Sequence, residues 1–145
     1  MLFKQSIILA MCVLMVSGGL ILFDESPCFI RPEYALPGIP KDPNNILNVT
    51  VPVECREGRI SWHYPRGHLI LSFPIIKKVQ KNICFKDSLA GSYFTITELP
   101  SNTTIGPINH NYPSCTDVIT DKDTRIKISA SEYNVYFGQL LYSLQ

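Results

Sequence analysis

The sequence predicts an all-β sandwich. Short runs of alternating apolar and polar residues, rich in β-branched and aromatic side chains, recur along the chain between clusters of turn-forming residues. No stretch after the N-terminal segment has a sustained helical period. With 145 residues, the chain has room for one ordinary domain and too little for two. We therefore expect one domain in which two sheets pack face to face.

The N-terminal segment is typical of a secretory signal peptide. Lys4 precedes an apolar run over residues 7–23, which has small residues near its end and acidic residues just beyond it. We expect residues 1–23 to be cleaved and the protein to be secreted, although the run does not fix the cleavage site. The run is also at the lower limit for a membrane span, so the alternative is an uncleaved anchor that tethers the protein to the outside of a membrane.

The cysteines predict two disulfide bonds. Cys12 lies in the N-terminal segment, and its removal leaves an even number of cysteines in an oxidising compartment: Cys28, Cys55, Cys84 and Cys115. Three pairings of these four residues are possible. Each bridge is expected to stabilise the fold by about 3–4 kcal/mol, because it restricts the unfolded chain.

Two glycosylation sequons agree with secretion. They begin at Asn48 and Asn102, and neither has proline at its middle position. Asn102 stands among turn-formers that should be exposed, whereas Asn48 lies in a strand-like run. Asn102 is therefore the stronger candidate for modification.

The first elements after the signal peptide are an irregular arm and an edge strand. Residues 28–45 are rich in proline and polar side chains, so we expect an arm that Cys28 holds in place. Residues 46–53 alternate well enough to form a strand. Pro52 cannot donate a ladder hydrogen bond, which favours an edge or a strand end.

The most strongly patterned stretch predicts a β-hairpin. Two strand-like runs, 59–64 and 68–73, flank a proline and a glycine at positions 65 and 67, which are typical of a tight turn. The alternation assigns four large apolar side chains to the core: Ile60, Trp62, Leu69 and Leu71.

The rest of the chain predicts further short strands. Strand-like composition recurs at residues 83–85, 93–97, 125–130 and 135–144. Residues 100–113 consist mostly of turn-formers and predict a long surface loop.

No pattern in the sequence predicts catalysis. The chain lacks a G-x-S-x-G elbow, a glycine-rich phosphate loop, an H-E-x-x-H helix and a C-x-x-C pair. We therefore expect no enzymatic activity, no cofactor and no small-molecule substrate. Loss of Lys4 leaves twelve basic residues against twelve acidic ones, and a neutral chain gives no support for binding to nucleic acid or, without a retained N-terminal segment, to membranes.

Metal binding is not expected either. His63 and His68 flank the predicted turn and could lie opposite each other, but no third ligand stands nearby in the sequence. Residues 121–123 carry two acidic side chains, but they lack the other ligand positions of a calcium loop and are interpreted as a solvated turn.

The predicted turn is the candidate for partner binding. Tyr64, Arg66 and His68 combine aromatic and arginine side chains at an exposed position. These residue types are common at the energetic centres of protein interfaces. The sequence therefore suggests contact with another extracellular protein through this turn.

The sequence resembles the N-terminal half of the meteorin family of secreted signalling proteins. The pattern W-x-Y-P-x-G-x-L from Trp62 to Leu69 carries most of the resemblance, together with the cysteine and glycine within residues 53–58. The remaining cysteines and the last strand follow in the family's order. The resemblance covers residues 28–145.

The resemblance implies a CUB-like antiparallel β-sandwich of the jelly-roll type over residues 28–145. It also implies bridges between Cys28 and Cys55 and between Cys84 and Cys115, and an extracellular ligand or modulator that acts on a cell-surface receptor. Meteorins continue into a netrin-like half, which would begin where this chain stops, so a role of that half is not transferred.

Many CUB domains bind calcium through acidic residues, one of them shortly after the third cysteine. Asp87 stands three residues after Cys84, at the matching position. No acidic residue lies between Gly58 and Cys84, where another ligand would be expected, and calcium needs several converging oxygens. We therefore expect no calcium site.

Overall fold

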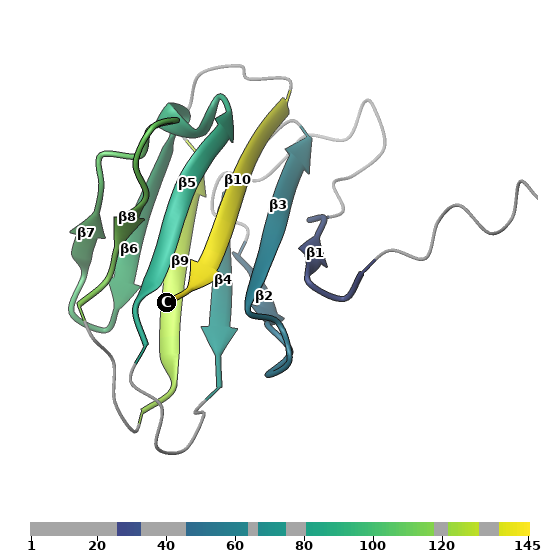
Figure 1. Cartoon of the computed structure of the whole chain (residues 1–145), viewed down its shortest axis with the longest axis vertical. Coiled ribbons are helices and arrows are strands. Elements are labelled where there is room, and N and C mark those ends of the chain that lie inside the picture. Colours follow the sequence, from purple (N-terminus) through teal and green to yellow (C-terminus); the bar gives the residue numbers. More distant parts are fainter. Residues whose placement is uncertain (1–25, 33–45, 64–66, 75–80, 118–121, 131–136) are drawn as a thin grey trace, which may run out of the picture.

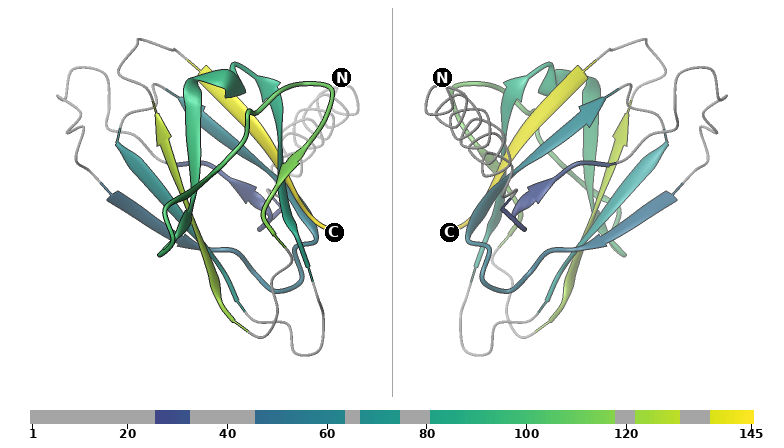
Figure 2. Two further views of the ribbon diagram at one scale, coloured as in Figure 1. Left: turned by 90° about the vertical axis from the view of Figure 1, so that its left-hand side faces the viewer. Right: turned by 90° about the vertical axis from the view of Figure 1, so that its right-hand side faces the viewer.

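The structure is a computed structural model, and it confirms the predicted β-sandwich. It describes residues 26–32, 46–63, 67–74, 81–117, 122–130 and 137–145. Two five-stranded sheets pack face to face, and Figure 2 shows them as two layers seen from the side. The predicted signal peptide lies outside the described residues. Within the described ranges, no helix is long and apolar enough to cross a membrane.

The sheet nearer the viewer in Figure 1, here called the front sheet, has the strand order β1-β3-β10-β5-β8. Its strands, in chain order, are β1 (Phe29–Ile30), β3 (Glu57–His63), β5 (Ile83–Leu89), β8 (Ser114–Cys115) and β10 (Phe137–Leu144). The long strand β10 lies between β3 and β5 and pairs antiparallel with both.

The rear sheet has the order β2-β4-β9-β6-β7. Its strands are β2 (Ile46–Thr50), β4 (His68–Phe73), β6 (Phe94–Leu99), β7 (Thr103–Ile105) and β9 (Thr124–Ala130), and a short 3-10 helix, η1 (Gly91–Tyr93), precedes β6. Of the eight strand pairings between described strands, β1 with β3 and β2 with β4 are parallel and the others are antiparallel. The expected antiparallel sandwich thus carries one parallel edge pair in each sheet.

The predicted hairpin is wrong, because β3 and β4 belong to different sheets. The chain crosses from the front sheet to the rear sheet between them. Alternation shows which side chains of a strand face the core. It does not show whether the next strand joins the same sheet, as in a hairpin, or the opposite sheet. Both strands therefore bury the predicted side chains from opposite sides.

The predicted core residues are buried. Ile60, Trp62, Leu69 and Leu71 are at most 1% exposed. Trp62 stacks across the sandwich on Phe94 of β6, with ring centroids 5.6 Å apart and an interplanar angle of 17°. Such aromatic pairs add stabilisation beyond the area that they bury.

Two segments that were expected to be irregular contain short strands. β1 lies in the predicted arm, where it pairs in parallel with β3 beside the first disulfide. β7 lies in the predicted loop 100–113, where it forms the edge of the rear sheet. Both strands are too short for a clear alternating pattern. The strand predicted over residues 46–53 is present as the edge strand β2 and ends before Pro52.

Both disulfides are present with the pairing that the resemblance implied. Cys28 bonds to Cys55, and Cys84 bonds to Cys115. The first bridge joins the segments that lead into β1 and β3. The second joins β5 and β8, where the two cysteines lie directly opposite each other. Both bridges therefore hold the front sheet.

Candidate binding face

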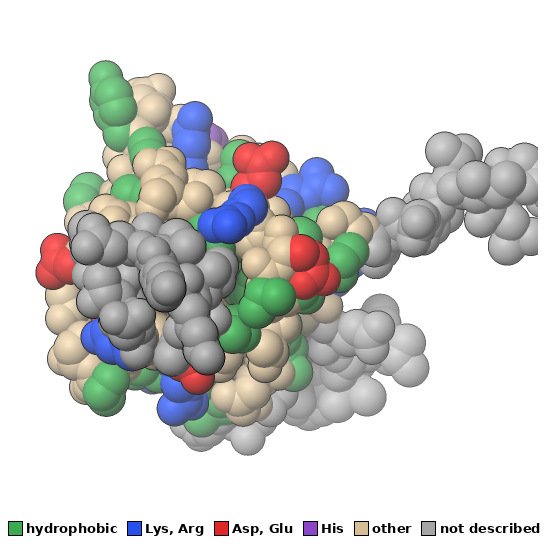
Figure 3. All heavy atoms as spheres, turned by 60° about the horizontal axis from the view of Figure 1, so that its bottom comes forward, with side chains coloured by type: hydrophobic (Ala, Val, Ile, Leu, Met, Phe, Trp, Pro, Cys, Tyr) green, Lys and Arg blue, Asp and Glu red, His purple; other side chains and the backbone are tan. Residues whose placement is uncertain are grey.

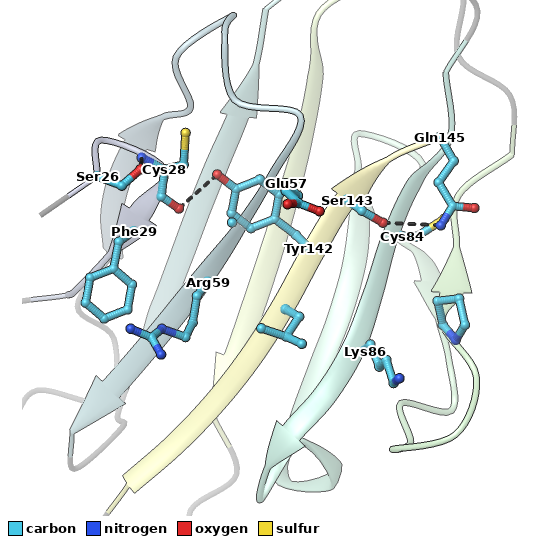
Figure 4. Close-up of a pocket in the computed structure, with 13 residues that line it drawn as sticks. Ser26, Cys28, Phe29, Glu57, Arg59, Cys84, Lys86, Tyr142, Ser143 and Gln145 are labelled. Carbon is cyan, nitrogen blue, oxygen red and sulfur yellow. Dashed lines mark hydrogen bonds between the residues drawn. The ribbon is translucent and has the colours of Figure 1, made fainter.

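The outer face of the front sheet carries an open groove of about 700 Å³. Most of the residues that line it lie on β1, β3, β10 and β5, and the others lie close to the ends of strands of the same sheet (Figure 4): Ser26, Cys28, Pro113 and Gln145. Outward residues on neighbouring strands lie side by side in rows across the sheet, because the register fixes which residues are opposite each other. The groove can therefore be described row by row.

The central row consists of Phe29, Arg59, Leu141 and Lys86, one from each of four adjacent strands. The Arg59 guanidinium carbon lies 4.1 Å from the centroid of the Phe29 ring, and that of Arg31 lies 4.7 Å from the same centroid. Leu141 stands between the two cationic side chains of the row and is 39% exposed. The row thus presents a cation on an aromatic ring, an exposed aliphatic side chain and a second cation.

The row toward the start of β10 is a hydrogen-bonded polar ladder. Ser88 donates from its hydroxyl to Oε1 of Gln139 at 2.9 Å, and Nε2 of Gln139 donates to the Ser61 hydroxyl at 3.0 Å. Both ends of the Gln139 amide are therefore occupied within the sheet. The ladder fixes the three side chains beside the groove, next to the central row.

At the opposite end of the groove lies Tyr142, whose ring packs into the core. Its hydroxyl donates to the carbonyl oxygen of Cys28 at 3.1 Å, as Figure 4 shows. Gly58 allows this approach, since a Cβ at that position would overlap both the Cys28 carbonyl and the Tyr142 ring. Burial raises the pKa of the Tyr142 hydroxyl to about 12. Glu57 on β3 and Ser143 on β10 lie opposite each other and form the outward row at this end.

A second polar cluster lies outside the groove, around Asp87. Its buried carboxylate accepts a hydrogen bond from the Gly91 amide at 2.6 Å and lies 3.3 Å from Nε2 of His110. Gly91 and His110 thus engage the carboxylate at the position where the resemblance suggested a calcium ligand. Among the described residues, no group of three or more histidine, cysteine, aspartate or glutamate side chains could hold a metal ion.

The predicted turn contacts are only partly described. Tyr64 and Arg66 lie outside the described residues, so their role stays a prediction. His68 is half-buried on β4, with Nδ1 2.8 Å from the Ser129 hydroxyl, and its pKa is lowered by burial and by Lys127. His63 packs edge-on against Phe137, with ring centroids 4.8 Å apart. The two histidines therefore lie on strands of different sheets and not opposite each other in a hairpin.

The two sequons lie at opposite edges of the rear sheet. Asn48 is exposed on the edge strand β2. Asn102 is exposed in the turn before the edge strand β7, with a φ of 58°, a left-handed conformation that asparagine tolerates. Both asparagines are therefore accessible, including the one that the strand pattern made the weaker candidate.

Sequence reasoning did not find the groove. Arg59, Leu141 and Lys86 are far apart in the chain, and only the register of β10 with β3 and β5 brings them into one row. Leu141 stands in the continuous apolar run 140–142, and Lys86 lies beyond the strand predicted over residues 83–85, so local alternation marks neither as outward. A register shift between Gln139 and Leu140 then decides which residue of β5 stands beside Leu141, and single-strand patterns cannot reveal it.

Comparisons with known proteins leave the family of this chain open. No protein-family model matches it, and no curated protein matches it. A solved structure, the pre-peptidase C-terminal domain of collagenase from Bacillus anthracis, matches with a TM-score of 0.45 and 9% sequence identity. The match covers 73% of this chain and 100% of that domain. A likeness at this level carries no statement about what this chain does.

Proposed function

We propose that this chain is a secreted meteorin-like protein that acts as an extracellular ligand or modulator. It binds a cell-surface receptor or another extracellular protein through the outer face of the front sheet. The central row of the groove is the observation that carries this proposal. It combines arginine and an aromatic ring, which are enriched at protein interfaces, with the exposed apolar surface of Leu141 on a pre-ordered sheet.

Two further observations support the proposal. Disulfides persist in oxidising compartments, which agrees with a protein that functions outside the cell. The sequons at Asn48 and Asn102 lie at the edges of the rear sheet, so glycans there leave the outer face of the front sheet uncovered. A glycoprotein with this arrangement can bind a partner through the front sheet.

Glycans introduced on each sheet test the proposed face. Arg59→Asn creates the sequon Asn-Ile-Ser on β3, and Lys127→Asn creates the same tripeptide on β9. Both positions are outward and lie on strands with a neighbour on each side. Because a glycan is bulky, we expect the one on β3 to abolish saturable binding of the tagged secreted chain to cells of the same organism. The one on β9 should leave that binding unchanged.

Matched controls separate the glycan from the lost charge. Arg59→Gln and Lys127→Gln remove the same charges without creating a sequon, and intact mass reports whether each new sequon is occupied. Lys86→Asn creates Asn-Asp-Ser on β5 and repeats the test if Arg59→Asn is not secreted. Saturable binding that survives an occupied glycan in the groove would exclude the front face, and absence of any saturable binding would exclude a surface ligand.

The mass of the product also tests secretion. A cleaved signal peptide predicts a chain in the medium that lacks residues up to about 23 and carries glycans. A full-length chain that stays with the membrane fraction would support the tethered alternative instead.

A further inference from the structure

The central row is a recognition pattern with two separated positive charges. The backbones of Arg59 and Lys86 are two strand spacings apart, about 10 Å, with Leu141 directly between them. The Arg59 guanidinium leans over Phe29 (Figure 4), which lies on β1, on the other side of β3 from β10, and this widens the separation of the charges. A ligand that contacts the whole row therefore meets charge, apolar surface and charge in sequence.

The two cations of the row have no anionic partner in the described part of the chain. Neither Arg59 nor Lys86 forms an ion pair with another described residue, unlike Lys122, which pairs with Glu98. Glu57 is the one carboxylate among the residues that line the groove, and it lies in the neighbouring row. The groove therefore has positive charge available to an acidic ligand.

The apolar centre of the row favours a peptide over a polyanionic sugar. A sulfated glycan needs a dense array of cations, whereas here Leu141 separates Lys86 from the two arginines that lie over the Phe29 ring, and Glu57 lies in the neighbouring row. Figure 3 shows acidic and basic side chains interspersed with apolar ones on the face that it displays. Within the groove, the positive charge is accompanied by the carboxylate of Glu57.

We propose that this row binds an acidic peptide segment of the partner in extended conformation. An acidic, an apolar and a second acidic residue at alternate positions lie on one side of a strand and span about 13 Å, which matches the widened row. The acidic side chains pair with Arg59 and Lys86, and the apolar side chain packs on Leu141. Carboxylates form charge-assisted hydrogen bonds with both cations, and with arginine these are often bidentate. This assignment rests on the function proposed above.

Selection from a displayed library of random peptides tests the ligand class. The probe is the tagged secreted chain, and the variant Arg59→Glu with Lys86→Glu reverses both charges of the row. We expect the selected peptides to carry acidic, apolar and acidic residues at alternate positions and to bind the variant about tenfold more weakly or worse. Lys127→Glu on the rear sheet is the matched control and should bind the selected peptides as well as the parent does. Leu141→Ser should lower the affinity for the same peptides.

Three results would overturn the assignment. Selected peptides without acidic residues would contradict it, and so would acidic peptides that bind the charge-reversed variant equally well. Retention of the chain on heparin that is lost in this variant, without selection of acidic peptides, would assign the row to a sulfated glycan. If glycans on β3 still block binding to cells in any of these cases, the proposed function stands and the ligand class alone fails.

Discussion

The two sheets of the sandwich differ in what they carry on their outer sides. The front sheet holds both disulfides and the groove with its row of cations around Leu141. The rear sheet holds no disulfide within its described strands, and both sequons lie at its edges. A binding face gains affinity when it is ordered before the partner arrives, since less entropy is then lost on binding. The front sheet is therefore the better ordered of the two, in keeping with the binding role proposed for it, whereas the rear sheet carries the candidate glycosylation sites.

Removal of a front-sheet disulfide is expected to have the largest effect. The variant Cys84→Ser with Cys115→Ser frees a loop with a sequence separation of 31 residues, and we expect it to lower the free energy of unfolding by about 3–4 kcal/mol. This is a large fraction of the stability of an ordinary domain, so secretion should fall sharply. The amount of protein in the medium and urea unfolding followed by the fluorescence of Trp62, the single tryptophan, measure the effect.

Cys12→Ser is the control for this variant. Cys12 lies in the predicted signal peptide, so its loss should leave secretion and stability unchanged. Normal yield and normal protease resistance of the double variant would show that the bridge does not hold the front sheet.

The next largest effect is expected where the two sheets pack against each other in the core. Gly138 of β10 faces Phe94 of the rear sheet, and a Cβ at position 138 would overlap the Phe94 ring. We expect Gly138→Ala to destabilise the protein by about 1–3 kcal/mol, because it overpacks the contact between Phe94 and Trp62. Urea unfolding measures this change in the free energy of unfolding.

A double-mutant cycle with Phe94→Leu isolates this contact. The smaller side chain gives the new methyl group room, so Gly138→Ala should cost less than in the parent, with a coupling energy of about 1 kcal/mol. The same cost in both backgrounds would mean that the front-sheet glycine does not act through the rear-sheet ring.

Much of the fold follows from local patterns, whereas the way the strands combine does not. Alternation in two runs identified Trp62 and Leu69 as core residues, and they are buried. The same pattern gave a hairpin where the chain crosses between sheets, because alternation specifies the face of a strand and not its sheet. The groove depends on long-range register, so Arg59 and Lys86 could not be recognised as members of one row before the strands were placed.

The smallest expected change in stability concerns the buried hydroxyl of Tyr142, and the pH dependence of unfolding tests that burial. The pKa of the Tyr142 hydroxyl is raised to about 12 by burial, whereas an unfolded tyrosine titrates near pH 10. Between these values the unfolded chain has lost its proton and the folded chain retains it, so stability falls as the pH rises. Below about pH 10 the Tyr142 hydroxyl is protonated in both states, so its contribution to stability is fully present. Stability of the parent should therefore decline from about pH 10 to 12.

Tyr142→Phe removes both the titrating group and the hydrogen bond to the Cys28 carbonyl. At pH 7 we expect the variant to be about 1 kcal/mol less stable than the parent, which is the usual net value of such a bond. As the pH rises through 10 to 12 the parent loses stability through Tyr142 and the variant does not, so the difference should shrink or reverse. Urea unfolding at a series of pH values measures both curves. Parallel curves over this range would mean that the Tyr142 hydroxyl is open to solvent in the folded protein.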